Sequence, residues 1–395
     1  MNDSTYIPFH HPSIGQEEMD AVQKVLASGW LTTGPVALQF EKDFAAYIGC
    51  KWALAVNSGT SALQLALDAI GLRAGDEVLV PSYTFTATAE VVTYFGARPV
   101  LCDSLVGGFN IDPTDVERRI TSRTRAIIPV HVAGEPCDLD ALHEVGRRHN
   151  LHVIEDAAHS LPAWSRGRRI GTISELTAFS FYATKTITTG EGGMLTTNDD
   201  AYAERARTMR LHGIGGDAWK RYSKAGSWFY EVHHAGYKLN LPDILAALGV
   251  IQLAKCDKFW KERSQVAAYY LDKFSQMEEL ELPPSGAEPS DHSWHLFILR
   301  LRAGALAINR DEFVEELKSA GIGTSVHFIP LHRHPYYIKE YGYQNQDFPR
   351  ADDSFVRALS LPIYPGLQEA QMRRVVESVQ NIVEKNRKKV MVALS

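Results

Sequence analysis

The chain has 395 residues, of which 45% are hydrophobic and 22% charged, and its formal net charge is −6. This composition is typical of a globular protein with two domains and argues against a general nucleic-acid-binding protein. The four cysteines form no C-x-x-C pair, which disfavours a disulfide framework or a zinc site. Because we find neither a secretory leader nor about 18 consecutive apolar residues, we predict a cytoplasmic protein without a membrane span or metal.

The first two thirds of the chain alternate short apolar runs with segments of helical periodicity. In residues 59–72, Leu63, Ala66, Leu67 and Ile70 follow the spacing of one buried helix face. The apolar runs indicate strands that are buried on both faces. They cover residues 52–56, 77–81, 98–102, 125–132, 151–155 and 177–182. This alternation predicts an α/β fold with a mainly parallel central sheet and helices on both faces.

The pattern changes after about residue 240. Residues 241–274 predict one long helix, and a mixed segment follows it. That segment has predicted strands near 292–301 and 323–331 and predicted helices near 311–320 and 367–387. We therefore predict a large domain of residues 1–260 and a small C-terminal α+β domain of residues 261–395.

Ligands of open parallel sheets bind beyond the carboxyl ends of the strands, so residues at strand ends are candidates for a site. After the first predicted strand, Ser58, Gly59 and Thr60 open a helix. The free N–H groups and the dipole of a helix N-terminus favour a phosphate, and glycine permits its close approach. The alternative interpretation is that Ser58 only caps the helix.

Two further strand ends carry charged residues. Asp156 ends an apolar run, where a buried carboxylate needs a cationic partner such as a protonated heterocyclic nitrogen; alternatively it caps the next turn. Lys185 follows an apolar run and precedes a loop of Thr and Gly. An apolar pocket lowers the pKa of a lysine and permits Schiff-base chemistry, whereas the alternative is a lysine whose head reaches water.

A phosphate cradle, a buried carboxylate and a lysine together match the three functional groups of pyridoxal 5'-phosphate (PLP): its phosphate, its pyridinium nitrogen and its aldehyde. Phe85 adds a flat face that could stack on the pyridine ring, unless it is an ordinary core aromatic. The default interpretation of His159 is a histidine of the core with a backbone hydrogen-bond partner.

The segments "NSGTSAL", "PSYTFTAT", "EDAAH", "SFYATKTITTGEGG" and "GYKLNLPDILAALG" resemble the DegT/DnrJ/EryC1/StrS family over nearly the whole chain. Members of this family are PLP-dependent aminotransferases of nucleotide-linked keto-sugars with the aspartate-aminotransferase fold (fold type I). The segments "PVHVAGEPCDLDAL" and "GYKLNLPDI" look most like the branch that aminates UDP-linked 4-keto sugars, including the UDP-4-amino-4-deoxy-L-arabinose synthases.

The resemblance assigns roles to single residues. Lys185 matches the family's Schiff-base lysine, and Asp156 matches the aspartate that faces the pyridinium nitrogen. His159 stands where the family carries Gln or His near the ring oxygen, and Phe85 matches the aromatic residue that covers the ring.

The phosphate contacts of the family match Gly59, Thr60 and Ser180, with Ser58 beside them. The resemblance also implies a homodimer in which a residue of "GYKLN" reaches the phosphate of the neighbouring subunit. Many relatives carry Asn where this chain has Lys238, so the contact falls to either Lys238 or Asn240.

The resemblance implies a two-step transamination. An amino donor, expected to be L-glutamate, converts PLP into pyridoxamine phosphate, which then aminates a UDP- or dTDP-linked keto-sugar, with position 4 of a UDP-sugar expected. Lys185 acts as general base and acid.

The basic segment 210–224 predicts a lid over the diphosphate, with Arg210, Lys220 and Arg221 as contacts, or alternatively a solvated loop. Gly213 and its neighbouring glycines suggest mobility there. His327 is expected to line the site from the small domain.

Three alternatives compete with this hypothesis. Dehydratases of the same family use pyridoxamine phosphate and carry His in place of the lysine, so Lys185 argues against that activity. A non-catalytic sugar-binding relative would be expected to lose Lys185 or Asp156, and both are present. An α/β hydrolase would need a G-x-S-x-G elbow around Ser58 or Ser180, and neither serine has one.

Overall fold

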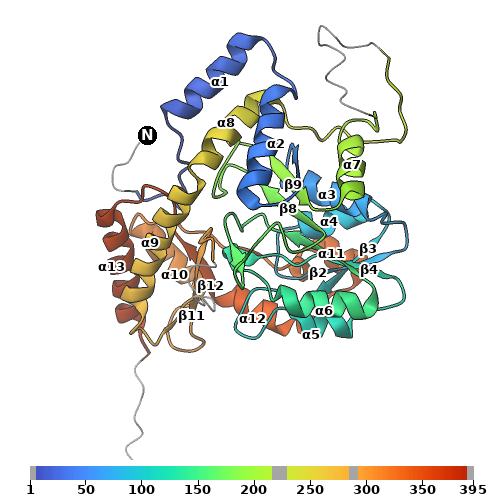
Figure 1. Ribbon diagram of the computed structural model, residues 1–395. Helices are drawn as coiled ribbons and strands as arrows, with labels where there is room; N and C mark the ends of the chain where they lie inside the picture. The colour runs from blue at the N-terminus through green and yellow to red at the C-terminus, as the bar shows by residue number, and fades with distance from the viewer. Residues whose placement is uncertain (1–5, 216–228, 284–291, 389–395) are drawn as a thin grey trace, which may run out of the picture.

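The computed structural model describes residues 6–215, 229–283 and 292–388 (Figure 1). Among these residues, no helix has the length and the apolar character that a membrane crossing requires. The four cysteines are free thiols.

A seven-stranded sheet forms the centre of the fold, in the order β1-β9-β8-β5-β4-β2-β3. Its strands are β1 (Trp52–Val56), β2 (Glu77–Pro81), β3 (Arg98–Cys102), β4 (Thr124–Ile127), β5 (His152–Asp156), β8 (Leu176–Ser180) and β9 (Gly193–Thr197). Only β9 runs antiparallel to its neighbours within this sheet. The predicted α/β fold with a mainly parallel sheet is confirmed. Strand β4 is shorter than predicted, and Pro129, which has no N–H for a ladder, follows its end.

Helices cover both faces of this sheet, and each face has its own hydrophobic core. One face carries α3 (Gly59–Ala69), α4 (Ala87–Thr93) and α7 (Asp200–Met209), and the other carries α2 (Pro35–Ile48), α5 (Pro113–Arg118) and α6 (Leu139–His149). The four apolar residues predicted to form the buried face of α3 are all buried. On the other face, the rings of Phe44 and Phe179 meet edge to face with centroids 5.2 Å apart, an arrangement that stabilises the pair beyond its burial.

The predicted long helix is two helices, α8 (Asp243–Ala254) and α9 (Cys256–Phe274), which meet at Lys255. The amine of Lys255 lies 2.6 Å from Glu17 and 2.8 Å from Glu18 on α1 (Gln16–Ser28). Because Glu18 is fully buried, its charge needs this partner, and the pair ties α1 to the bend between α8 and α9.

A second, three-stranded sheet of β10 (Leu280–Glu281), β11 (Phe297–Leu301) and β12 (Ala358–Leu361) lies beside the first. It packs with α9, α10 (Arg310–Ser319) and α13 (Glu369–Asn386) in a third hydrophobic core. The two last helices agree with the predicted ranges. The predicted strand at 323–331 is wrong: within it only Ser325 bridges to a strand, at Ser360. The division at residue 260 stays a prediction, since α9 crosses it.

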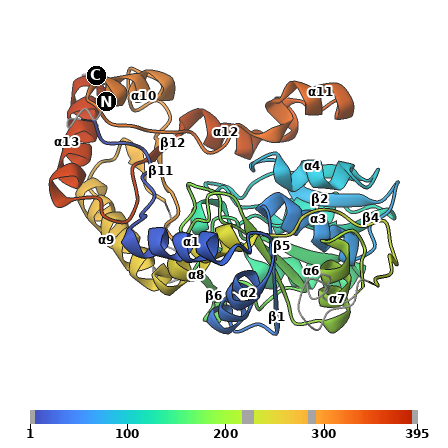
Figure 2. The ribbon, with the colours of Figure 1, turned by 90° about the horizontal axis from the view of Figure 1, so that it is seen from above.

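The helices α11 (Pro335–Tyr341) and α12 (Pro349–Arg357) leave this second sheet and extend over the first (Figure 2). Asp103, one residue beyond β3, accepts hydrogen bonds from the backbone N–H groups of Arg350 (3.1 Å) and Ala351 (2.8 Å), and so caps α12. The Tyr83 hydroxyl donates to the carbonyl of His327 over 2.5 Å. The large sheet therefore fixes the segment that carries His327.

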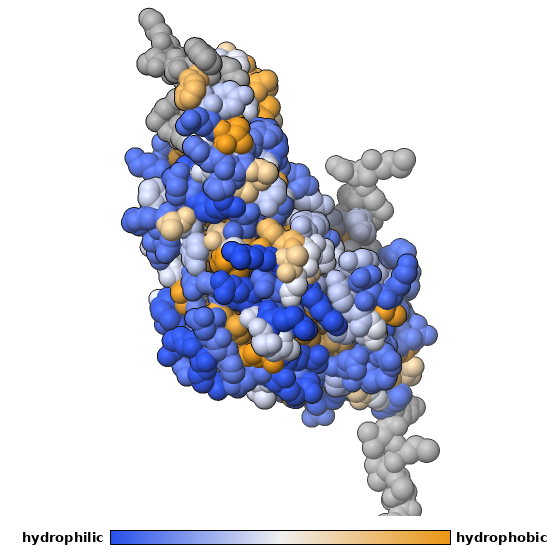
Figure 3. All heavy atoms as spheres, turned by 90° about the vertical axis from the view of Figure 1, so that its right-hand side faces the viewer, coloured by the Kyte–Doolittle hydropathy of each residue, from blue (hydrophilic) through white to orange (hydrophobic). Residues whose placement is uncertain are grey.

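Figure 3 shows one face of the molecule, which is mainly hydrophilic, with hydrophobic residues in separate patches between polar ones. Such scattered patches are ordinary for a folded chain. They do not mark a binding site on this face.

Candidate active site

The carboxyl ends of β1, β2, β5 and β8 lie at the same edge of the large sheet, because these four strands are parallel to one another. Ser58 follows β1, Phe85 follows β2, Asp156 ends β5 and Lys185 follows β8. The sheet therefore brings the predicted site residues of four separate segments to one edge.

Lys185 lies in the loop after β8 and not at the end of the strand. The strand ends at Ser180, and the Lys185 N–H donates to the carbonyl of Tyr182 over 2.9 Å, which closes a turn. Burial lowers the pKa of the Lys185 amine to about 8, although the nearby charge of Asp156 raises it. About a tenth of the amine is therefore neutral, and nucleophilic, at pH 7.

Asp156 is 6% exposed. The Thr88 hydroxyl donates to its Oδ2 over 2.8 Å, and the Ala158 N–H donates to its Oδ1 over 3.1 Å. Burial raises the pKa of this carboxyl, while these two donors and the Lys185 charge oppose the rise. The turn-capping bond to Ala158 is thus present, and Thr88, in the first turn of α4, also holds the same carboxylate.

The predicted phosphate cradle combines helix capping with close packing. Ser58 caps α3, since its Oγ accepts a hydrogen bond from the Ser61 N–H over 3.0 Å. Gly59 approaches the end of β8 so closely that an added Cβ would lie 2.9 Å from the Cβ of Ser180. Thr60 is the second residue of α3. Ser58, Gly59, Thr60 and Ser180 therefore lie together at the open N-terminus of this helix.

His159 is held on several sides. Its Nδ1 accepts a hydrogen bond from the Ala133 N–H over 3.2 Å, so the proton of the neutral ring is on Nε2. Its ring lies 4.3 Å from that of His295 and stacks on Phe328 at 5.6 Å, both measured between centroids. Burial and the Lys185 charge hold the pKa of His159 well below its ordinary value. It is therefore a neutral donor through Nε2.

The segment of His327 reaches the same edge. Burial and the charge of Lys185 lower the pKa of His327 to about 4, and its Nδ1 lies 3.0 Å from the Ser360 Oγ. Phe328, the next residue, contacts the ring of Phe85 at 6.0 Å between centroids. The Phe85 side chain is 60% exposed, so it is not the core aromatic of the alternative interpretation.

The sequence analysis missed four contributors: Thr88, Ala133, Phe328 and His10. Thr88 and Phe328 lie in segments that carry predicted site residues, but the sequence does not show in which direction their side chains point. Ala133 acts through its backbone alone. His10 donates from its Nε2 to the Ala183 carbonyl over 3.1 Å, from a segment 173 residues away in sequence.

The structure does not support Arg210 as a substrate contact. Arg210 is 7% exposed, forms an ion pair with Glu41 and donates to the carbonyl of Ala55 over 3.0 Å. A buried guanidinium with these partners has a structural role, which corrects our expectation. Lys220 and Arg221 lie outside the described residues.

Gly213 and Gly215, the two glycines of this basic segment within the described residues, are closely packed. A Cβ added at Gly213 would lie 1.8 Å from the carbonyl oxygen of His234. The two arms around residues 216–228 also share hydrogen bonds, including the His212 N–H to the Tyr237 carbonyl over 2.7 Å. The mobility expected of the stretch of Gly213, Gly215 and Gly216 stays a prediction, and Gly216 lies outside the described residues.

The two candidates of "GYKLN" differ in their surroundings. Lys238 is exposed. The Asn240 amide instead donates to the Oγ1 of Thr33 over 2.6 Å within the same chain. Three residues later, Asp243 accepts N–H groups from the first turn of α2.

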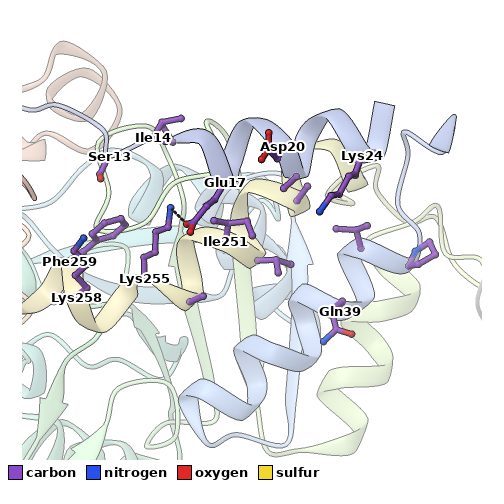
Figure 4. A pocket seen from close by; sticks show the side chains of 18 of the residues that line it. Ser13, Ile14, Glu17, Asp20, Lys24, Gln39, Ile251, Lys255, Lys258 and Phe259 are labelled. Carbon is purple, nitrogen blue, oxygen red and sulfur yellow. Dashed lines mark ion pairs between the residues drawn. The ribbon is translucent and has the colours of Figure 1, made fainter. Parts of the chain in front are cut away.

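A groove of about 1110 Å³ lies elsewhere, between α1, α2 and α8 (Figure 4). The ion pair of Glu17 and Lys255 lies within it. It contains no predicted site residue.

A scan against family models matches residues 12–380 to the DegT/DnrJ/EryC1/StrS aminotransferase family. A curated relative, the spore coat polysaccharide biosynthesis protein SpsC of Bacillus subtilis, is 46% identical over 380 residues, which are 96% of this chain and 97% of SpsC.

Two solved structures extend the comparison. The putative sugar aminotransferase Spr1654 of Streptococcus pneumoniae, in its PMP-form, superposes with a TM-score of 0.90 at 32% identity, over 96% of this chain and 99% of that one. DesV of S. venezuelae, in complex with a ketimine intermediate, superposes with a TM-score of 0.85 at 38% identity, over 93% and 94% of the two chains.

Proposed function

This chain belongs to the DegT/DnrJ/EryC1/StrS aminotransferase family, and from that premise we propose that it is a PLP-dependent aminotransferase of nucleotide-linked keto-sugars. We further propose L-glutamate as the amino donor and position 4 of a UDP-linked sugar as the acceptor. The observation that carries the proposal is that Lys185, whose pKa burial lowers to about 8, lies within the electrostatic influence of buried Asp156 and at the same sheet edge as an open helix N-terminus.

The residues at this edge fit PLP. The N-terminus of α3 offers backbone N–H groups for a phosphate, and Gly59 leaves no Cβ between this helix end and Ser180. Asp156 is a buried carboxylate whose pKa burial raises, so a protonated ring nitrogen would stabilise its charged form. The exposed ring of Phe85 suits a stacked pyridine.

PLP supplies an aldehyde that condenses with amines and a ring that withdraws electrons from an adjacent carbanion. Lys185 presents the amine and, once free, moves a proton from and to the substrate carbon as general base and acid. Asp156 keeps the ring nitrogen protonated. His159, fixed as a neutral Nε2–H donor, can hydrogen-bond an oxygen on the ring.

The relatives support a sugar substrate. SpsC is named for spore coat polysaccharide biosynthesis, and DesI was solved in the presence of its TDP-sugar product. DesI is 26% identical to this chain, so it supports the substrate class and not the choice of nucleotide. The UDP-linked 4-keto sugar rests on the resemblance of the segments 129–142 and 236–244.

We also propose a homodimer with shared sites. Asn240 already has a partner within its own chain, whereas Lys238 is exposed, so Lys238 is the residue that contacts the cofactor phosphate of the neighbouring subunit.

The first test is the visible absorption spectrum of the purified protein with PLP, before and after addition of L-glutamate without sugar. We expect a yellow band that bleaches with glutamate in the wild type. We expect Lys185→Ala to lose turnover on a panel of UDP- and dTDP-linked keto-sugars. A tenth or more of wild-type turnover in Lys185→Ala would contradict the role of Lys185, and a wild type without any band would contradict the proposed function itself. A band that glutamate leaves unchanged would exclude this donor.

A further inference from the structure

We propose that His10 is a positioning residue for Lys185, which holds the turn that carries the reactive amine through a hydrogen bond to the carbonyl of Ala183. This inference rests on the proposed function of Lys185. It adds the N-terminal segment of the chain, which the sequence analysis did not examine for chemistry, to the machinery of the site.

The N-terminal segment is held near the site by hydrogen bonds to the part of the chain that contains the second sheet. Ile7 pairs with the segment around Ile322: its N–H donates to the Gly321 carbonyl over 2.9 Å, and its carbonyl accepts from the Gly323 N–H over 2.8 Å. A Cβ at Gly323 would lie 2.7 Å from the backbone nitrogen of Phe9. Figure 2 shows this segment running from the N-terminus past β11 towards α1.

The contact of His10 has a defined direction. Its Nε2 lies 3.1 Å from the Ala183 carbonyl oxygen, which can only accept, so His10 donates through Nε2. Burial and the positive charge of Arg263 lower the pKa of His10 to about 4, although the bond to Ala183 opposes this. His10 is therefore neutral at neutral pH and keeps one acceptor nitrogen.

The start of the turn that His10 holds is fixed by its own loop, since the Phe181 N–H donates to the Gly192 carbonyl over 2.8 Å. The turn begins after Ser180, where β8 ends, and it closes with the bond from the Lys185 N–H to Tyr182. Among the described residues, the bond from His10 is the hydrogen bond that residues 183–185 make with a segment distant in sequence. Without this bond, the Ala183 carbonyl, two residues before Lys185, is no longer fixed by another part of the chain.

The same segment also contacts the opposite wall of the site. Phe9 stacks on His327 with centroids 5.2 Å apart and planes 29° apart. A small cavity is lined by Phe9, His10 and His327 together with Thr184, the residue before Lys185. Residues 9 and 10 thus link the Lys185 turn to the His327 segment, so a change at His10 alters the direction of the amine.

The test compares two amides that differ by one methylene. Gln at position 10 can place its amide N–H near the Nε2 of histidine, whereas Asn is too short. The variants are His10→Gln and His10→Asn, with His11→Asn as the control, because His11 is the exposed neighbour on the same segment. Two readouts are measured on the PLP-loaded proteins: the pH titration of the visible band, and the rate constant of its bleaching over a series of L-glutamate concentrations.

We expect His10→Asn to shift the titration of the band and to lower the limiting bleaching rate constant at least tenfold, with half-saturation by glutamate changed less than threefold. Displacement of the Lys185 amine lowers this rate constant because the reacting groups must be closely aligned. His10→Gln should stay within threefold of the wild type, and His11→Asn should match it. The proposal is overturned if His10→Asn behaves as the wild type, or if Gln and Asn are equally impaired, including equal loss of PLP binding. A wild type that shows no band contradicts the proposed function instead.

Discussion

Lys185 experiences two opposed influences at the scale of single side chains. Burial disfavours its charged form, and Asp156 favours it, with burial the larger effect. Four histidines around it, His10, His159, His295 and His327, all have lowered pKa values and add no positive charge at neutral pH. Asp156 is therefore the charged group whose removal should affect Lys185 most directly.

The pH dependence of PLP uptake follows from this balance. Condensation needs the neutral amine, so the initial rate of band formation with cofactor-free protein should fall about tenfold per pH unit below pH 8 and level off above it. Because Asp156 raises the pKa of Lys185, Asp156→Asn should move this midpoint to lower pH. Stopped-flow absorbance measures both. A midpoint above pH 10 in the wild type, or an upward shift in Asp156→Asn, would be inconsistent with the buried amine.

At the scale of elements, helix ends are where distant parts of the chain are joined. The first turn of α2 has no side-chain cap from its own sequence, since its N-cap residue is Gly34 and its first residue is Pro35. Asp243 on α8 supplies one: its Oδ1 accepts from the N–H groups of Gly34 (2.7 Å) and Ala37 (2.9 Å), and its Oδ2 from that of Val36 (3.1 Å). This explains the aspartate of "GYKLNLPDI" by the fold, without a role in cofactor binding.

We therefore expect Asp243→Ala to lower the free energy of unfolding by roughly 2 to 3 kcal/mol, because it leaves buried donors of a helix N-terminus unpaired. Urea denaturation of the cofactor-free protein measures this. Asp20→Ala is the matched control: within the described residues Asp20 accepts a hydrogen bond from Gln16 alone, at the surface of α1, so this substitution should cost about 0.5 kcal/mol or less. Equal effects of the two substitutions would refute the capping role.

At the scale of the whole molecule, the site is assembled from two sheets and the N-terminal segment. The large sheet supplies Ser58, Phe85, Asp156 and Lys185, and the segment after β11 supplies His327. Contacts such as the cap of α12 by Asp103 fix this segment to the large sheet. The proposed dimer would complete the site with Lys238.

The dimer proposal separates Lys238 from Asn240. Lys238→Ala should raise the dissociation constant of PLP at least tenfold while thermal stability stays within about 0.5 kcal/mol, because an exposed side chain contributes little to folding. Asn240→Ala should mainly destabilise the chain, since it removes the bond to Thr33. Fluorescence titration with PLP and thermal denaturation distinguish the two. Weaker PLP binding in Asn240→Ala than in Lys238→Ala would reverse the assignment.

The sequence by itself determined the central sheet and the residues at its strand ends. Runs such as 52–56, 77–81 and 98–102 are nearly continuous in apolar residues, as expected for strands buried on both faces, and their limits agree with those of β1, β2 and β3. Asp156 and Lys185 stood out because charges after such runs need partners, and the parallel arrangement brings strand ends to one edge.

Only the tertiary structure decided the orientation of side chains and the contacts between residues that are far apart in the sequence. The pairing of Arg210 with Glu41, the bond from His10 to Ala183 and the cap of α2 by Asp243 join residues 169, 173 and about 207 positions apart, which no local pattern contains. The strand predicted at 323–331 has suitable residues, but its backbone meets a strand only at Ser325 and then turns towards the large sheet. Strand ladders and buried ion pairs form only where another segment supplies the partner, and folding alone places that segment.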